Sequence, residues 1–258
     1  MNEASRGTLE SATSLLGEFR RLWTLARRGW LNGARPWLGI AAAFAAALVP
    51  TFLHFHILSP ELWRSGAVYA SLPLPMELAR LPMSLFFPTP YLPMWAACAQ
   101  LLVVVGLGEL ILGRWLTITV VFAGHFGSTL VARALLDSVH GHALGLAPAL
   151  AHVLDTGPSA ATTAIGACLL VSVRMNRGAA LLSVSLLVAA FFVRGVDGVE
   201  HMVALAIGVL AGVAFRVATS RSAHIKPPWS IVHLVQTSDM DETCRSPTSD
   251  RVAGDARP

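Results

Sequence analysis

Charged residues are scarce in this chain of 258 residues, because Asp, Glu, Lys and Arg make up only 13% of it. Soluble domains carry about 25%. Lysine is nearly absent: 18 of the 19 basic residues are Arg, and the other is Lys226. The Arg residues are spread along the chain rather than gathered on one face, which argues against a nucleic-acid-binding protein. Attraction to anionic membrane lipid fits this distribution better.

Three further features are missing. The only cysteines are Cys98, Cys168 and Cys244, and their spacing fits neither a metal site nor a redox motif nor a disulfide framework. Residues 1–36 lack an apolar run near their start, which excludes a cleavable signal peptide. The alternation of apolar and polar residues that marks a membrane β-barrel is also absent.

What the chain does contain is apolar sequence, since 54% of its residues are hydrophobic and its mean hydropathy is +0.61. Several apolar runs approach the ~20 residues that a membrane-spanning helix needs. We therefore predict an all-α polytopic membrane protein with six transmembrane helices, at 37–55, 94–112, 115–136, 157–173, 179–193 and 199–217.

These runs divide the chain into three parts. Residues 1–36 form a basic, amphipathic N-terminal segment, residues 37–217 form the membrane domain, and the polar tail 218–258 is expected to be largely disordered. In the first part, an apolar stripe at helical spacing predicts a helix at the membrane interface, comprising Leu15, Leu16, Phe19, Leu22, Trp23 and Ala26, with Leu25 off the stripe. The proline-rich segment 56–92 is expected to lie half-sunk in the bilayer edge.

The basic residues also predict the orientation. With six spans both termini lie on one side of the membrane, and that side receives 15 of the 19 basic residues while the other receives four. The positive-inside rule then places both termini in the cytoplasm. At the turn after the second span, we expect Glu109 to pair with Arg114 or with a neighbouring backbone group.

The fourth and sixth spans each begin with a residue of catalytic type. The interval along the chain from Ser159 to Arg174 equals the interval from His201 to Arg216. If each arginine marks the cytoplasmic edge, both side chains lie about 22 Å from it, which is some ~8 Å below the outer surface. Ionisable residues inside a membrane are costly and tend to be functional. The matched depth therefore predicts that the two side chains form one site.

The chemistry of such a pair is nucleophilic. A serine hydroxyl becomes a strong nucleophile when a neutral histidine accepts its proton. The backbone N–H groups at the start of the helix, those of Gly157 and Ser159, are candidates to stabilise an oxyanion. The small residues Gly208 and Gly212 would let the two helices approach closely. A lone helix-start serine is usually only a cap or a packing residue, so the hypothesis depends on the pairing.

Four stretches together resemble motifs of one known family. They are Gly157-Pro158-Ser159-Ala160, His201 with Gly208, Glu109 with Leu112-Gly113, and Glu61-Leu62-Trp63-Arg64. They resemble the Gly-x-Ser-Gly, the sixth-helix His-x-x-Gly-x-x-x-Gly, the Glu-x-x-x-Gly turn and the Glu-x-Trp-Arg of the rhomboid family of intramembrane serine proteases, in an actinobacterial-type divergent branch. The resemblance covers roughly residues 61–217. It implies a Ser159–His201 dyad that cleaves membrane-embedded protein substrates in a bacterial plasma membrane.

The sequence departs from that family at the oxyanion site. Ala160 replaces the second glycine of Gly-x-Ser-Gly, and Ala204 replaces the first glycine after His201. The family's second-helix His-x-x-x-Asn is missing near residues 93–97. The alternative is therefore a catalytically inactive rhomboid-like protein that binds transmembrane client segments. No cofactor is expected, and no metal, because the loop histidines His140, His142 and His152 lack the partners of a full ligand set.

Overall fold

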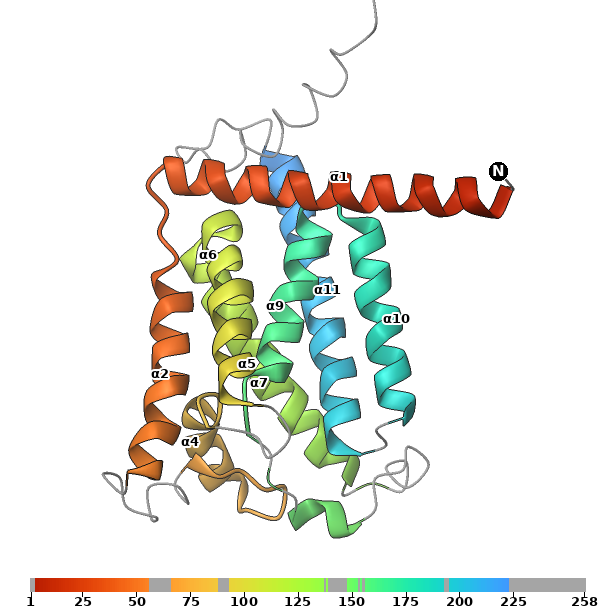
Figure 1. Cartoon of the computed structure of the whole chain (residues 1–258). Coiled ribbons are helices and arrows are strands. Elements are labelled where there is room, and N and C mark those ends of the chain that lie inside the picture. Colours follow the sequence, from red (N-terminus) through yellow and green to blue (C-terminus); the bar gives the residue numbers. More distant parts are fainter. Residues whose placement is uncertain are drawn as a thin grey trace, which may run out of the picture.

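The chain folds into upright helices with one helix laid across their end, as a computed structural model shows (Figure 1). The structure describes residues 3–55, 66–87, 93–136, 138, 148–152, 154, 156–192 and 195–222. Throughout these residues the regular structure is helical and contains no β-strand. Several sequence features lie outside the described residues, namely the stretch Glu61-Leu62-Trp63-Arg64, His140, His142 and the tail from residue 223.

The elements follow one another along the chain as α1 (Glu3–Leu31), α2 (Trp37–His54), α4 (Leu74–Ser84), α5 (Met94–Gln100), η1 (Leu101–Val105), α6 (Gly106–Leu112), α7 (Arg114–Leu136), η2 (Pro148–His152), α9 (Ser159–Ser172), α10 (Asn176–Phe192) and α11 (Val196–Ser222). The segment η1 is one turn of π-helix, so that α5, η1 and α6 form a continuous helix. The short helix α4 arises inside the proline-rich segment.

The described residues include three helices that are long and apolar enough to cross a membrane. They are Met94–Leu112, Arg114–Leu136 and Val196–Ser220, and each overlaps a predicted span almost end to end. The stretches Trp37–Phe52 and Ser159–Ser172 are shorter apolar helices. The prediction of an all-α chain with helices able to span a membrane is confirmed for the described residues, whereas the count of six spans stays a prediction.

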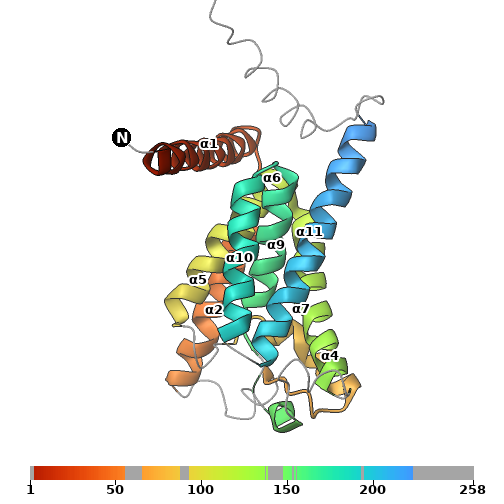
Figure 2. The ribbon, with the colours of Figure 1, turned by 90° about the vertical axis from the view of Figure 1, so that its right-hand side faces the viewer.

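Helix α9 forms the centre of the bundle. Its small side chains pack against α7, α11 and the α5–η1–α6 helix, and Figures 1 and 2 show it between them. Its buried residues include Ala160, Ala161, Ala164, Ile165, Ala167 and Cys168, each no more than 3% exposed. Small residues let neighbouring backbones approach closely, which is how membrane helices gain packing energy without a hydrophobic driving force.

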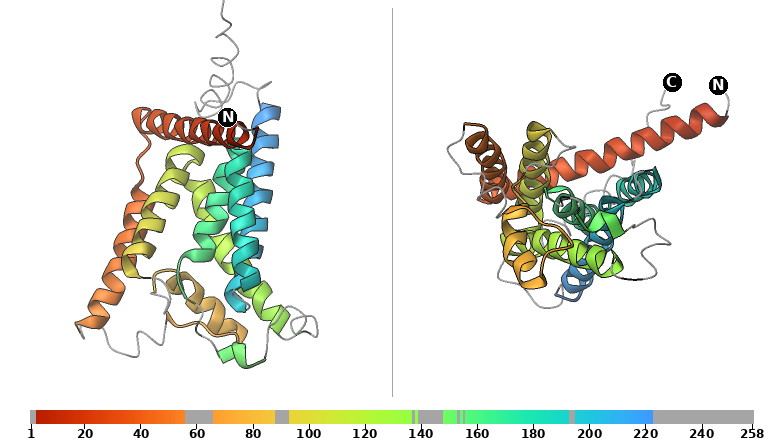
Figure 3. Two further views of the ribbon diagram at one scale, coloured as in Figure 1. Left: turned by 45° about the vertical axis from the view of Figure 1, so that its right-hand side comes forward. Right: turned by 90° about the horizontal axis from the view of Figure 1, so that it is seen from below.

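One end of the bundle carries α1, the C-termini of α9 and α11 and the N-terminus of α10 (Figures 1 and 3). There the Glu18 carboxylate accepts hydrogen bonds from the backbone N–H groups of Arg177 (3.2 Å) and Gly178 (3.0 Å), which caps α10. The backbone of Gly29 lies so close to α6 that an added Cβ would stand 2.1 Å from the Leu110 carbonyl oxygen. Helix α1 is therefore docked on the bundle.

The apolar residues of α1 divide differently from the predicted stripe. Leu25 and Ala26 are buried against the bundle, at 3% and 4% exposed, whereas Phe19 and Trp23 are 59% and 71% exposed. The reason is that the close contact at Gly29 turns the Leu25 side of the helix toward α6. Part of the stripe is thus available to lipid and part is used in packing.

The turn from α6 to α7 is held by Glu109, which is only 3% exposed. Its carboxylate accepts the Leu38 backbone N–H at 2.6 Å and the Arg114 Nε–H at 2.9 Å. The expected pairing with Arg114 is confirmed. One side chain thereby joins the start of α2 to both arms of the turn.

Candidate active site

Ser159 is the first residue of α9, at the end of the bundle opposite α1. Gly157 precedes it with φ = +114°, a conformation that residues with a side chain rarely adopt, and the Gly157 N–H donates to the Ser84 carbonyl at 2.9 Å. Pro158 occupies the cap position, so Ser159 emerges directly from this turn. Its side chain is half-buried and its Oγ forms no hydrogen bond to any other described residue.

His201 lies in the second turn of α11 and is also partly exposed. Its Nδ1 stands 2.6 Å from the Asp197 carbonyl oxygen. A carbonyl oxygen only accepts, so Nδ1 carries the hydrogen, and in a neutral imidazole the lone pair then lies on Nε2. This is the tautomer that a general base needs, since Nε2 is the atom able to take a proton.

The packing of α9 and α11 sets the relative height of the two residues. An added Cβ at Gly208 would stand 2.1 Å from the Ala164 carbonyl oxygen, and one at Gly212 would stand 2.8 Å from that of Cys168. Both contacts join positions with the same offset along the chain. An added Cβ at Gly208 would also stand 2.9 Å from the Ala167 Cβ, so Gly208 lies between the levels of Ala164 and Ala167. Seven residues earlier on each helix, His201 lies between the levels of Gly157 and Ala160, a range that includes Ser159.

His201 lies on the face of α11 that packs against α9. Gly208 and Gly212 follow it at two and three helical turns, so each glycine lies within about 20° of His201 around α11. The two glycines touch α9. The structure therefore brings Ser159 and His201 to one end of one helix pair, although no hydrogen bond joins their side chains.

The two predicted oxyanion donors differ in their present partners. The N–H of Gly157 is engaged with Ser84, whereas that of Ser159 belongs to the first helical turn, where N–H groups have no partner within the helix. The Thr162 hydroxyl donates to the Ser159 carbonyl at 3.0 Å and makes a longer contact of 3.5 Å with Gln100 on α5. Gln100 therefore reaches the first turn of α9 from the predicted second span.

Sequence reasoning did not single out Gln100. The available signal was its isolation, because it is the one amide in the otherwise apolar run 94–108. The sequence also gave no indication of a second serine–histidine pair, Ser84 and His125, which is buried. Ser84 Oγ lies 2.9 Å from His125 Nε2, and the two residues are 0% and 2% exposed. Its burial keeps this second pair away from any substrate.

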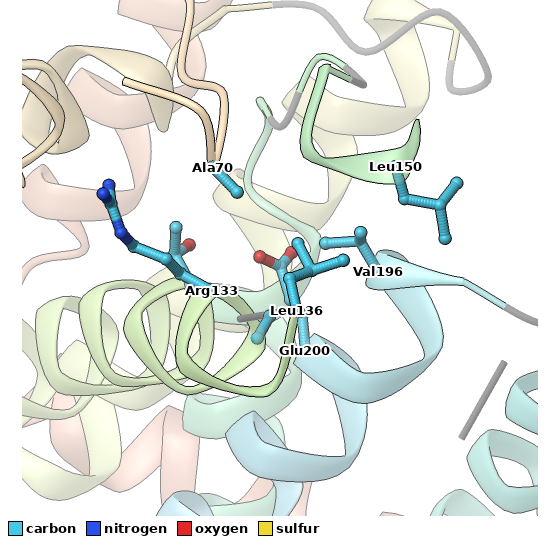
Figure 4. A pocket seen from close by; sticks show the side chains of 8 residues that line it. Ala70, Arg133, Leu136, Leu150, Val196 and Glu200 are labelled. Atoms are coloured by element: carbon cyan, nitrogen blue, oxygen red, sulfur yellow. The ribbon is translucent and has the colours of Figure 1, made fainter. Parts of the chain in front are cut away.

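A small pocket opens beside the start of α11 (Figure 4). Its polar lining comes from Thr129 and Arg133 on α7 and from Glu200, the neighbour of His201. Its interior has about the size that holds one water molecule. Neither Ser159 nor His201 lines this pocket, which lies between α7 and the start of α11.

Comparison of the chain with protein-family models, with curated proteins and with solved structures gives no match.

Proposed function

We propose that this protein is an intramembrane serine endopeptidase of rhomboid type, with Ser159 as nucleophile and His201 as general base. Its substrates are transmembrane proteins that reach the site within the lipid. The proposal includes a membrane domain of six spans, with both termini in the cytoplasm and the site near the outer face. The observation that supports it is the close contact of α9 and α11 at Gly208, which is consistent with Ser159 and His201 lying at similar levels along the two helices.

The reaction follows from these groups. Ser159 Oγ attacks the carbonyl carbon of the scissile peptide while His201 Nε2 takes the hydroxyl proton. The oxyanion is stabilised by N–H groups in the first turn of α9, including that of Ser159. Collapse of the tetrahedral intermediate breaks the C–N bond, and His201 gives its proton to the leaving amine. Water then hydrolyses the acyl-enzyme and regenerates the serine.

A specific observation favours the alternative, a catalytically inactive rhomboid-like protein that binds transmembrane client segments. Ser159 Oγ and His201 form no hydrogen bond, and the Gly157 N–H is already engaged. The loss of one oxyanion donor lowers a rate by about 10²–10³. The two functions therefore differ in whether the serine is activated.

The test is labelling of the purified protein in detergent by a fluorophosphonate, which reacts with activated serines. We expect labelling of the wild type and its loss in both Ser159→Ala and His201→Ala. Matched controls are Ser183→Ala and His54→Ala, because Ser183 bonds only within α10 and His54 is exposed at the end of α2.

The outcomes separate the two functions. Labelling that survives in the controls and disappears in the site variants supports the protease, and cleavage of a transmembrane reporter in liposomes should follow the same pattern. If the folded wild type neither reacts with the probe nor cleaves the reporter, while Ser159→Ala still crosslinks to a transmembrane segment, the results favour the client-binding function over the protease.

A further inference from the structure

Helix α4 is fastened to α7 by two polar contacts. The Glu77 carboxylate pairs with the Arg133 guanidinium, and Ser84 Oγ pairs with His125 Nε2 at 2.9 Å. The contacts are two helical turns apart on each helix, in opposite order along the chain, so α4 and α7 run antiparallel. Glu77 and Ser84 are both 0% exposed. Buried polar contacts of this kind fix a helix in one position, because an unmade contact leaves a desolvated polar group.

The contact at Ser84 is linked by hydrogen bonds to the turn that precedes the proposed nucleophile. The Ser84 hydroxyl donates its single hydrogen to the Leu81 carbonyl at 2.9 Å, so its oxygen accepts from His125 Nε2–H. The Ser84 carbonyl in turn accepts the N–H of Gly157, the residue whose positive φ starts the turn into α9. A chain of hydrogen bonds therefore runs from α7 through α4 to the turn before Ser159.

We propose that His125 is a positioning residue for Ser159 and acts through Ser84. This inference rests on the proposed function, since it assigns a role in the same reaction. His125 holds the last turn of α4, and α4 holds the Gly157 turn that aims Ser159. His125 is not itself a catalytic residue, because it is enclosed and donates its Nε2–H to Ser84. Displacement of a reacting group by about 1 Å costs on the order of 10²-fold in rate, so a small shift of the turn is measurable.

The first experiment compares the saturating labelling rate and the half-saturating concentration of the fluorophosphonate in His125→Leu and His125→Gln. The amide N–H of Gln stands near the position of Nε2, whereas Leu keeps the volume and removes the donor. We expect His125→Leu to lower the saturating rate about tenfold or more with little change in probe binding, and His125→Gln to restore most of it. Ser84→Ala should behave like His125→Leu.

A matched control is Ser128→Ala. Ser128 is equally buried on α7, but its hydroxyl donates to the backbone of its own helix at 3.0 Å. Its replacement should affect thermal stability and leave the labelling rate unchanged. A merely structural role for His125 would lower the rate only together with the melting temperature, and would not show rescue by Gln.

The second experiment measures amide hydrogen exchange of Gly157, which does not depend on catalysis. We expect faster exchange in His125→Leu and in Ser84→Ala, and near-wild-type exchange in His125→Gln. Unchanged exchange in both disruptive variants overturns the positioning role, even if the wild type is labelled. Absence of wild-type labelling overturns the proposed protease, while the exchange result still reports on the hydrogen-bond chain.

Discussion

The contact between α9 and α11 at Gly208 gives the sharpest prediction. A Cβ at this position would stand 2.1 Å from the Ala164 carbonyl oxygen and 2.9 Å from its carbon, whereas ordinary contact begins near 3.4 Å. The helices must therefore separate by about 1 Å to admit Gly208→Ala, because a close-packed interior has no spare room. The obstacle is backbone, which cannot rotate away as a side chain can.

The magnitude follows from two opposing terms. Replacing a helical glycine by alanine gains up to about 1 kcal/mol where there is room. Overpacking a well-packed core costs about 1–3 kcal/mol. The matched control is Gly166→Ala on α9, whose added Cβ would meet Val104 at an ordinary 3.6 Å. Both variants receive the helical gain, so their free energies of unfolding should differ by the overpacking cost alone, roughly 1–3 kcal/mol.

The same displacement acts on the proposed site. Since Gly208 and His201 lie on one face of α11, moving that face away from α9 carries His201 away from Ser159. A misplacement of about 1 Å can lower a catalytic rate on the order of 10²-fold. Thermal unfolding in detergent and the fluorophosphonate rate provide the two readouts. If Gly208→Ala is as stable and as reactive as Gly166→Ala, the inferred packing of α9 on α11 is wrong.

Three further changes test the contacts that fix the bundle. Glu77→Ala leaves the Arg133 guanidinium without its carboxylate and should lower the free energy of unfolding by about 3–5 kcal/mol. Adding Arg133→Ala should recover part of that loss, and additive shifts of the melting temperature in the double variant would contradict the pairing. Glu109→Ala removes the acceptor for the Leu38 N–H in the first turn of α2 and should lower the free energy of unfolding by about 1–3 kcal/mol, with Glu109→Gln intermediate. Equal melting temperatures of Glu109→Ala and the wild type would refute this. Glu18→Ala should speed amide exchange at Arg177, and unchanged exchange would mean that α1 does not cap α10.

The helices themselves could be predicted because each follows from a local property of the sequence. The run 115–136 has no charge until Arg133, and the structure places α7 at Arg114–Leu136. The pairing of Glu109 with Arg114 was equally predictable, since the two residues lie close together across a glycine turn. Local periodicity also predicted α1, but not which part of its stripe packs against the bundle.

The contacts around Ser84 could not be predicted, because they join residues far apart in the chain. Ser84 and His125 belong to different helices, and Ser84 lies in a proline-rich segment that favoured no regular structure. A serine near a helix end is ordinary in composition. Only the docking of α4 on α7 gives it a role, and that docking depends on the distant ion pair of Glu77 with Arg133.

An approximate depth in the membrane could be estimated from the sequence for Ser159 and for His201, whereas a contact between their side chains could not be predicted. Counting from Arg174 and Arg216 gave equal depths, yet an arginine side chain can reach the interface from more than one turn. The glycine contacts place Gly208 between Ala164 and Ala167 of α9, so His201 lies between the levels of Gly157 and Ala160, in the turn that contains Ser159. That range is about 4.5 Å along the axis, which is less than one helical turn but longer than a hydrogen bond. Charge at the ends of a span therefore indicates the approximate depth of a residue, while the packing of small residues fixes how two helices stand against each other.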